Sequence, residues 1–516
     1  MKIPKFNSNR GEEYFRSDSF TSDLKNHAVK GVGLTLVSSF GTFFIQIPAV
    51  AILARLLEPN DFGLVAMVTA IYGFFQGLRY FGLLEATIQE KEINHEKIST
   101  LFWVNVAFSI LITIIFMALG PLLSRFYGEP RITWIAIIIS LDLFIGGLGT
   151  QHRALLARNF EFIENTGIEI ASTIIAYGTA ILLAWKGWGY WALVSRWVVY
   201  SMAQTAGVWI FCKWRPGLPA FGTGVMPMLK FGMNMLGNYS LSYVSKNIDR
   251  VLIGWRYGSL SLGYYDRAYY IYYLPVAKIS FPIVNVANTT LSKLRDDLDK
   301  YKRYYLDGVS SISFVSFLIS AIVVVMSKDL VLLFLGPQWG QSAKLLSVFG
   351  VVIGIQMVYG TNAWIHLSMG RSDRLFRWNI LAATCIVTSI TIGLRFGLLG
   401  VIIAYAATIH ILVGPCLWYA GKNINLKLAT IISVIWKNYL SAICSGLFLW
   451  YIFYSFDFTN AIFIELNVFT RLVTSTTIFA LSYVFMIKII LRGSIPIAKY
   501  IPFLKEMVPN VFKSNK

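Results

Sequence analysis

Residues 104–123 read VNVAFSILITIIFMALGPLL, a stretch without a single charged side chain. A helix of about 20 mostly apolar residues is long enough to cross the hydrocarbon core of a bilayer. Four further stretches are equally free of Asp, Glu, Lys and Arg, namely 31–54, 308–327, 345–370 and 396–421. This pattern predicts a chain that crosses a membrane many times.

The composition supports the same class. The chain has 516 residues, of which 56% are apolar and 14% are charged, whereas a soluble domain has about 45–50% apolar and about 25% charged residues. A soluble protein and a disordered chain are therefore both excluded. The four cysteines lie singly in apolar stretches with no histidine cluster nearby, so we expect no metal site and no cofactor.

Other stretches reach spanning length only when a few charges are admitted. On that basis the sequence predicts an all-α polytopic membrane protein with about fourteen transmembrane helices. The predicted helices are 31–55, 63–88, 99–121, 132–153, 165–185, 188–212, 228–254, 263–290, 304–326, 345–367, 375–395, 397–420, 434–456 and 467–490.

The net charge of +19 reflects an excess of Lys and Arg, and the positions of these residues indicate the orientation of the chain in the membrane. With the N-terminus inside, and with basic residues near helix ends counted in the adjoining segment, 30 of the 45 Lys and Arg residues fall in inside segments, 8 fall in outside segments and 7 fall within helices. Basic residues mark the cytoplasmic side of membrane proteins. We therefore expect both termini in the cytoplasm, and we expect no nucleic-acid partner.

The predicted outer loops are short, and the longest covers about 17 residues, 327–343. An enzyme that acts on the outer face usually needs a larger loop to build its site. Transport is therefore favoured over catalysis, and no catalytic residue is predicted.

Three weak sequence matches recur at similar offsets. Residues 61–64 (DFGL) match 261–264 (SLGY) at an offset of 200, and two further pairs match at offsets of 208 and about 211. Internal repeats in transporters commonly pack around a substrate path. The predicted organisation is a cytoplasmic segment 1–30, a six-helix bundle 31–212, a linker 213–227, a second six-helix bundle 228–420, an extra helix pair 434–490 and a cytoplasmic tail 491–516.

Three segments resemble a known family. They are RLLEPNDFG at 55–63, QHRALLARNFEF at 151–162, and NIDRVLIG at 247–254 followed by LGYY at 262–265. They are similar to those of the polysaccharide transporters, the lipid-linked oligosaccharide flippases of the multidrug/oligosaccharidyl-lipid/polysaccharide exporter superfamily. The resemblance covers about residues 30–420.

The resemblance implies two six-helix bundles around a central cavity, alternating access and a bacterial inner-membrane location. It implies a polyprenyl-diphosphate-linked oligosaccharide as the substrate, for surface polysaccharide biosynthesis. A polysaccharide polymerase and a chain-length regulator are then candidate partners, beside membrane lipid.

Ionisable residues inside membrane spans are costly and usually face a cavity or a partner. Basic residues exceed acidic ones by two in the predicted spans, which favours an anionic substrate because phosphate binds Arg and Lys. The candidate substrate-binding residues are Arg79, Arg196, Lys246, Arg250, Arg267 and Lys278, with the sugar-contacting candidates Tyr269, Tyr272 and Tyr273. Lys278 is the foremost of these, because it lies between Pro275 and Pro282, which we expect to interrupt the helix.

Structural roles remain open for several of these residues. Lys278 is equally suited to an ion pair within the bundle, and Arg55 to the membrane interface. The neighbours Asp249-Arg250 and Asp266-Arg267 can pair with each other, and the tyrosines can serve packing or an interfacial belt.

No GxxxxGK[ST] motif for nucleotide binding occurs, so transport must draw on an ion gradient, a membrane potential or removal of the product. Glu85, Asp142 and Glu169 are the candidate ion-coupling residues. Glu85 is also placed to pair with Arg79. The alternatives are a multidrug-type cation antiporter on the same fold and a membrane polysaccharide polymerase.

Overall fold

The computed structural model describes residues 24–80, 83–90, 92–220, 225–455 and 466–490. Within these ranges the regular structure is helical and contains no strand, which confirms the all-α prediction. The predicted cytoplasmic tail 491–516 and most of the segment 1–30 lie outside the described residues. Eight of the described helices are long and apolar enough to cross a membrane, and a bent pair raises this number to nine. The chain is a multi-pass membrane protein, while the count of fourteen spans stays a prediction.

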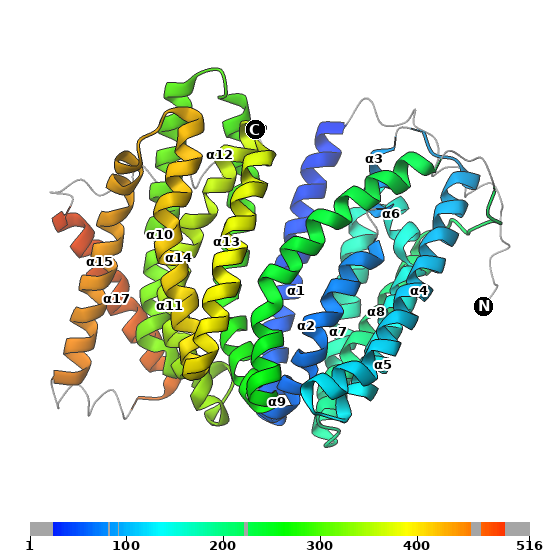
Figure 1. The fold of residues 1–516 in the computed structure, drawn as a ribbon, viewed down its shortest axis with the longest axis horizontal. Helices are drawn as coiled ribbons and strands as arrows, with labels where there is room; N and C mark the ends of the chain where they lie inside the picture. Colours follow the sequence, from blue (N-terminus) through cyan, green and yellow to red (C-terminus); the bar gives the residue numbers. More distant parts are fainter. Residues whose placement is uncertain (1–23, 81–82, 91, 221–224, 456–465, 491–516) are drawn as a thin grey trace, which may run out of the picture. The chain divides into compact units, whose positions relative to one another are not determined.

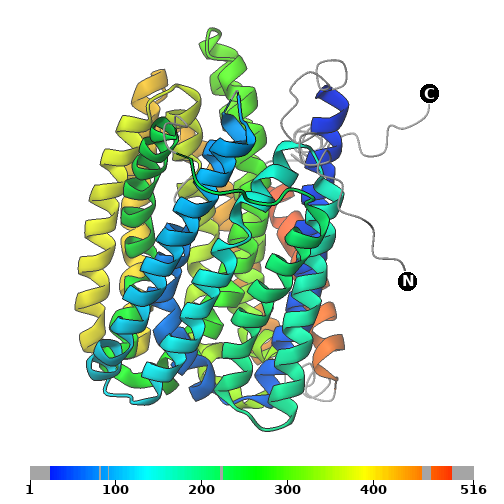
Figure 2. The same cartoon turned by 90° about the vertical axis from the view of Figure 1, so that its right-hand side faces the viewer.

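The chain divides into two compact units, Met1–Gly263 and Tyr264–Lys516. The boundary lies inside one long helix, α9, and the predicted bundle limits of 31–212 and 228–420 stay a prediction. Figure 1 and the turned view in Figure 2 show the helices within each unit running side by side.

The first unit contains eight helices before α9 in the described residues. They are α1 (Leu24–Leu56), α2 (Pro59–Tyr80), α3 (Leu83–Gln89), α4 (His95–Tyr127), α5 (Arg131–Gly147), α6 (Thr150–Arg158), α7 (Phe162–Trp185) and α8 (Tyr190–Phe211). Helix α7 packs against α1 and α8, and α5 packs against α2, α4 and α8.

Helix α4 contains the stretch 104–123, and its ends follow local sequence signals. Asn94 caps the N-terminus, because its side-chain oxygen accepts a hydrogen bond from the backbone nitrogen of Lys97 at 2.8 Å. Gly128 follows the last turn with φ +69°, a left-handed conformation that glycine adopts without steric penalty. The span therefore begins and ends where the sequence supplies the matching caps.

Helix α9 (Met226–Lys293) joins two helices that the sequence predicts as separate, 228–254 and 263–290. The only non-helical backbone inside it is at Gly258, with φ +79° and ψ 180°. The helix therefore kinks at a glycine, which tolerates positive φ. The expected interruption around Pro275 and Pro282 is not found, because the backbone of both is helical.

Near this kink, α2 and α9 approach each other backbone to backbone. A Cβ atom on Gly63 would collide with the carbonyl group of Ser259, and one on Gly263 would collide with the carbonyl group of Pro59. The Ser259 hydroxyl also donates a hydrogen bond to Asn60. The offset of 200 relates one collision to the other, because it pairs Gly63 with Gly263 and Pro59 with Ser259. The contact therefore has the symmetry of the predicted repeat.

The second unit begins with the remainder of α9. It continues with α10 (Leu298–Phe334), η3 (Pro337–Trp339), α11 (Gly340–Gly360), α12 (Asn362–Ser368), α13 (Ser372–Gly393), η4 (Leu394–Phe396), α14 (Gly397–Gly421), η5 (Lys422–Ile424), α15 (Leu428–Ser455) and α17 (Val468–Ile490).

Small residues bring α10 and α11 together. The Ser316 hydroxyl donates to the Gly354 carbonyl at 3.3 Å, and the Ser320 hydroxyl donates to the Gly350 carbonyl at 2.5 Å. Small side chains and hydrogen bonds of this kind hold helices together in lipid, where no hydrophobic force distinguishes helix from solvent. The last helix is tied to this core by Arg471 of α17, whose Nε donates to Asp329 of α10 at 2.8 Å.

Candidate functional site

The candidate site lies beside a break between two helices of one apolar segment. Helices α5 and α6 meet at an angle of 42° across the residues between Gly147 and Thr150. The sequence there is Gly146-Gly147-Leu148-Gly149, and glycine weakens a helix. Such a break frees backbone carbonyl groups, which in a membrane need partners from the protein itself.

Side chains from neighbouring helices supply these partners. Each donates a hydrogen bond to a carbonyl group in the last turns of α5 or in the residues that join α5 to α6. The pairs are Ser201 to Asp142 at 3.3 Å, Thr205 to Ile145 at 2.9 Å, Thr150 to Gly146 at 3.3 Å, Asn105 to Gly147 at 3.2 Å and Trp209 to Leu148 at 2.9 Å. Side chains of α4, α6 and α8 therefore satisfy carbonyl groups that the break would otherwise leave without hydrogen bonds.

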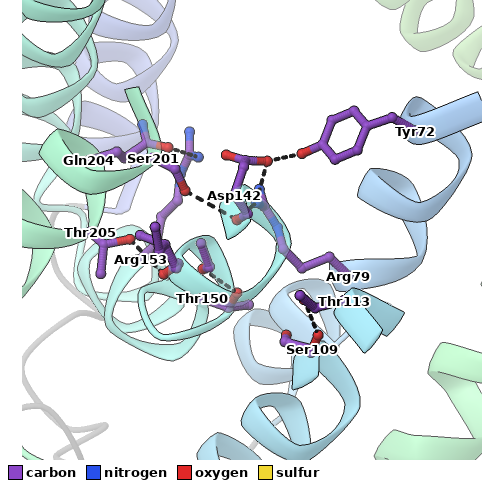
Figure 3. A network of polar contacts seen from close by, with 12 residues as sticks. Tyr72, Arg79, Ser109, Thr113, Asp142, Thr150, Arg153, Ser201, Gln204 and Thr205 are labelled. Atoms are coloured by element: carbon purple, nitrogen blue, oxygen red, sulfur yellow. Dashed lines mark hydrogen bonds and ion pairs between the residues drawn. The ribbon is translucent and has the colours of Figure 1, made fainter. Parts of the chain in front are cut away.

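A buried ion pair lies at the same place (Figure 3). Arg79 of α2 donates from Nη1 to the Asp142 carbonyl oxygen at 3.0 Å and to the Asp142 carboxylate at 3.3 Å. The Tyr72 hydroxyl donates to the same carboxylate oxygen. Arg79 is 5% exposed and Asp142 is 2% exposed. Two of the predicted residues are thus brought together, one from the substrate-binding set and one from the ion-coupling set.

Glycine makes room for this pair. A Cβ on Gly146 would collide with the guanidinium group of Arg79, and a Cβ on Gly147 would collide with the Ser109 hydroxyl. Gly146 therefore admits the arginine to its carboxylate, and Gly147 makes room for the Ser109 side chain. A buried pair of opposite charges is net neutral, so protonation of Asp142 or a shift of Arg79 would change the charge of the site.

A small polar cavity lies farther along this network. Arg153 of α6 donates to Gln204 of α8 at 3.2 Å, and Arg153 also lines a cavity of about 210 Å³. Glu169 of α7 lines the same cavity and accepts a hydrogen bond from Ser38 of α1 at 2.8 Å. The predicted ion-coupling residue Glu169 therefore faces a polar space. The side chain of Glu85 lies outside the described residues.

Arg196 of α8 contacts aromatic rings. Its guanidinium carbon lies 4.7 Å from the ring centre of Trp197 and 5.2 Å from that of Tyr177. Trp197 in turn packs edge-on against Tyr72, with ring centres 5.5 Å apart. Arg196 therefore stands one aromatic layer away from the Arg79–Asp142 pair, and cation–π contacts hold its side chain in place.

The predicted residues of α9 are distributed along that helix. In the first unit Lys246 is exposed, and Arg250 donates to Asn247 at 2.7 Å. In the second unit Arg267 pairs with its neighbour Asp266 at 2.6 Å, which is the local pairing that the sequence left open. Lys278 is exposed.

The predicted tyrosines of the second unit form an aromatic cluster with Phe349 of α11. Tyr272 is 2% exposed and stacks on Phe349, with ring centres 4.9 Å apart. Tyr269 packs against both, whereas Tyr273 is 47% exposed. Tyr272 therefore lies in the interior of the second unit, and Tyr273 is the tyrosine of the three that presents the most surface.

Comparison with known proteins agrees with this architecture. The chain is 25% identical over 429 residues to the teichuronic acid biosynthesis protein TuaB of Bacillus subtilis, covering 82% of this chain and 88% of that protein. It is 22% identical over 364 residues to the succinoglycan biosynthesis transport protein ExoT of Rhizobium meliloti, covering 70% and 74%. The solved structure of the lipid II flippase MurJ in an inward closed conformation matches with a TM-score of 0.70 at 14% identity, covering 89% of this chain and 99% of that one.

A family model described as polysaccharide biosynthesis protein matches residues 52–344. This stretch covers more than half of the chain, and it contains the Arg79–Asp142 pair, the break between α5 and α6, and all of α9. The chain therefore belongs to the polysaccharide biosynthesis protein family.

Proposed function

We propose that the protein is a flippase that moves polyprenyl-diphosphate-linked oligosaccharide repeat units across the bacterial inner membrane for surface polysaccharide biosynthesis. The observation that carries the proposal is family membership of a multi-pass chain, because relatives in polysaccharide biosynthesis include one named as a transport protein. The fold is that of a solved lipid flippase, which supports movement of a lipid-linked substrate.

The charges in the spans support an anionic substrate. Two carboxylates in the predicted spans have basic partners, Asp142 with Arg79 and Asp266 with Arg267. We assign Arg196, Lys246 and Lys278 to the diphosphate and glycan, together with Arg250; the side chains of Lys246 and Lys278 are exposed. Alternating access between the bundles 31–212 and 228–420 would expose these groups to each side in turn.

We assign the coupling role to Asp142 and Glu169. Asp142 lies on α5, five residues before that helix ends at the break, and its carbonyl oxygen accepts hydrogen bonds from Arg79 and Ser201. A change in its protonation or pairing can therefore alter the contacts near the break. Glu169 lines the polar cavity next to Arg153, which gives it a route to water or ions. Glu85 keeps its predicted role in this proposal.

The proposal carries a location and partners. Both termini lie in the cytoplasm, because the basic residues gather in the predicted inside segments. The protein performs no covalent chemistry itself. It hands repeat units to a polysaccharide polymerase whose product length is set by a regulator.

Replacing either Arg196 or Lys278 by alanine is expected to lower the amount of surface polysaccharide, while the protein still inserts into the membrane. The reason is the loss of a cation assigned to the lipid diphosphate. Lys186→Ala is the matched control, because Lys186 is an exposed cation between α7 and α8. Immunoblots of membranes report insertion, and quantitative sugar analysis reports export. If both variants export as much as Lys186→Ala, these two residues do not bind the substrate.

Deletion of the gene separates a flippase from a polymerase. A strain without the flippase should accumulate single lipid-linked repeat units in the inner leaflet, where reagents added outside cannot modify their sugars. Single units that reach the outer leaflet and remain unpolymerised would contradict the proposed function.

A further inference from the structure

Two cavities of the second unit share a boundary at one end of α10. The first is a groove of about 660 Å³ between α10, α11 and α15. Its lining is mostly apolar and includes side chains that are well exposed, with Val351 at 41%, Leu447 at 61% and Trp450 at 54%. The second is a cavity of about 770 Å³ at the start of α11. Ser327 and Lys328 line both.

The second cavity is cationic. Lys328 of α10 and Lys344 of α11 both line it and both are exposed. The lining of the two cavities contains no Asp or Glu among the described residues. The nearby Asp329 is occupied by Arg471 of α17. The N-terminus of α11 at Gly340 adds the positive end of a helix to the same lining.

An apolar groove that adjoins a cationic cavity matches the two parts of a lipid. We propose that the two adjoining cavities bind a membrane phospholipid with an anionic head group, whose phosphate contacts Lys328 and Lys344 and whose acyl chain lies in the groove. The chain would then contact α15 and α10 together, and so hold the last helices against the core of the second unit. This site is separate from the transport of the repeat unit.

Gly446 of α15 provides a direct test of the groove. It lines the groove, and a Cβ built on it has no atom within 4 Å. A large side chain at this position would therefore fill space that the acyl chain needs without displacing protein atoms. Gly178 of α7 is equally open and lines none of the three cavities described here.

The experiment is native mass spectrometry of the purified full-length protein, with phosphatidylglycerol and phosphatidylcholine added in equal amounts. We expect the protein to retain phosphatidylglycerol preferentially. Lys328→Gln and Lys344→Gln should each weaken this retention by about fivefold, because a basic residue near an anionic lipid contributes on that order. Arg395→Gln, which removes an exposed cation from η4 outside both cavities, should have no effect.

Gly446→Phe should reduce retention of both lipids, whereas Gly178→Phe should leave it unchanged. The lysine variants alter only exposed side chains, so they test the head-group contact even if Gly446→Phe fails to accumulate. Equal retention by the double lysine variant and the unchanged protein would overturn the proposal, as would equal retention of the two lipids. Preferential capture of an added polyprenyl diphosphate over phosphatidylglycerol would also overturn it, by assigning the cavities to the transported substrate.

Discussion

The Arg79→Gln variant is expected to lose transport and to unfold at a markedly lower denaturant concentration than the unchanged protein. Arg79 and Asp142 are both buried, and their side chains are in contact. Removing one partner of a buried ion pair leaves the other charge uncompensated, which costs about 3–5 kcal/mol of the free energy of unfolding. Denaturant titration in mixed micelles measures this cost, and repeat-unit translocation measures the functional loss.

A matched control lies in the same unit. Arg131 pairs with Glu129 at 2.8 Å, but the side chain of Arg131 is 43% exposed. Hydrogen bonds from Arg131 hold the pKa of the Glu129 carboxyl below its usual range. Because an exposed pair contributes about 0–1 kcal/mol, Arg131→Gln should change stability little.

A double variant separates the cost of an uncompensated buried charge from the cost of losing the Arg79 side chain. Arg79→Gln combined with Asp142→Asn removes both buried charges, so it should recover a large part of the stability that Arg79→Gln loses. Transport should stay low in the double variant if Asp142 is a coupling residue. An Arg79→Gln variant as stable as Arg131→Gln would contradict the buried-pair interpretation.

Alanine at Gly63 or at Gly263 is expected to block transport and to cost about 1–3 kcal/mol, the usual range for overpacking. A Cβ at either position would collide with backbone atoms of the facing helix, which cannot rotate away as a side chain can. The α2–α9 contact would then no longer close. Gly178→Ala is the control, because its Cβ meets nothing within 4 Å.

Cross-linking measures this closure. Asn60 and Ser259 lie at the contact, with Asn60 Oδ1 and Ser259 Oγ 2.5 Å apart. Cysteines at both positions should react efficiently with a short bifunctional thiol reagent in the otherwise unchanged chain. The yield should fall when Gly63→Ala is added. If the yield and transport are both unaffected, the close approach of α2 and α9 does not limit the transport cycle.

Much of the fold follows from local sequence. Charge-free stretches of spanning length have a single physical solution in a membrane, a helix, so α4, α10, α11 and α14 lie where hydropathy places them. Caps such as Asn94 and Gly128 set where α4 begins and ends. The break of α9 at Gly258 falls between the predicted helices 228–254 and 263–290, whereas the interruption expected around Pro275 and Pro282 is absent.

The site is less predictable. Asp142 stands out in the sequence as a carboxylate within a span. The sequence does not indicate that Arg79 is its partner. Arg79 contacts Asp142 from 63 positions away along the chain, a separation that no local sequence pattern indicates. The contacts of Tyr72 and Ser201 with Asp142 are not predictable from the sequence, because a tyrosine or a serine in a span has many ordinary roles. The glycines at 146, 147 and 149 were the available signal, since they mark a break whose carbonyl groups need donors.

Purified protein in lipid vesicles provides the most direct test of the flippase function. The vesicles would contain a polyprenyl-diphosphate-linked oligosaccharide in both leaflets, together with an imposed ion gradient and membrane potential. A glycan-modifying reagent outside then reaches only the outer leaflet. We predict that nearly the whole pool becomes modified in vesicles with the protein, against about half in empty vesicles. Modification that stops at half in both would contradict the proposed transport of lipid-linked repeat units.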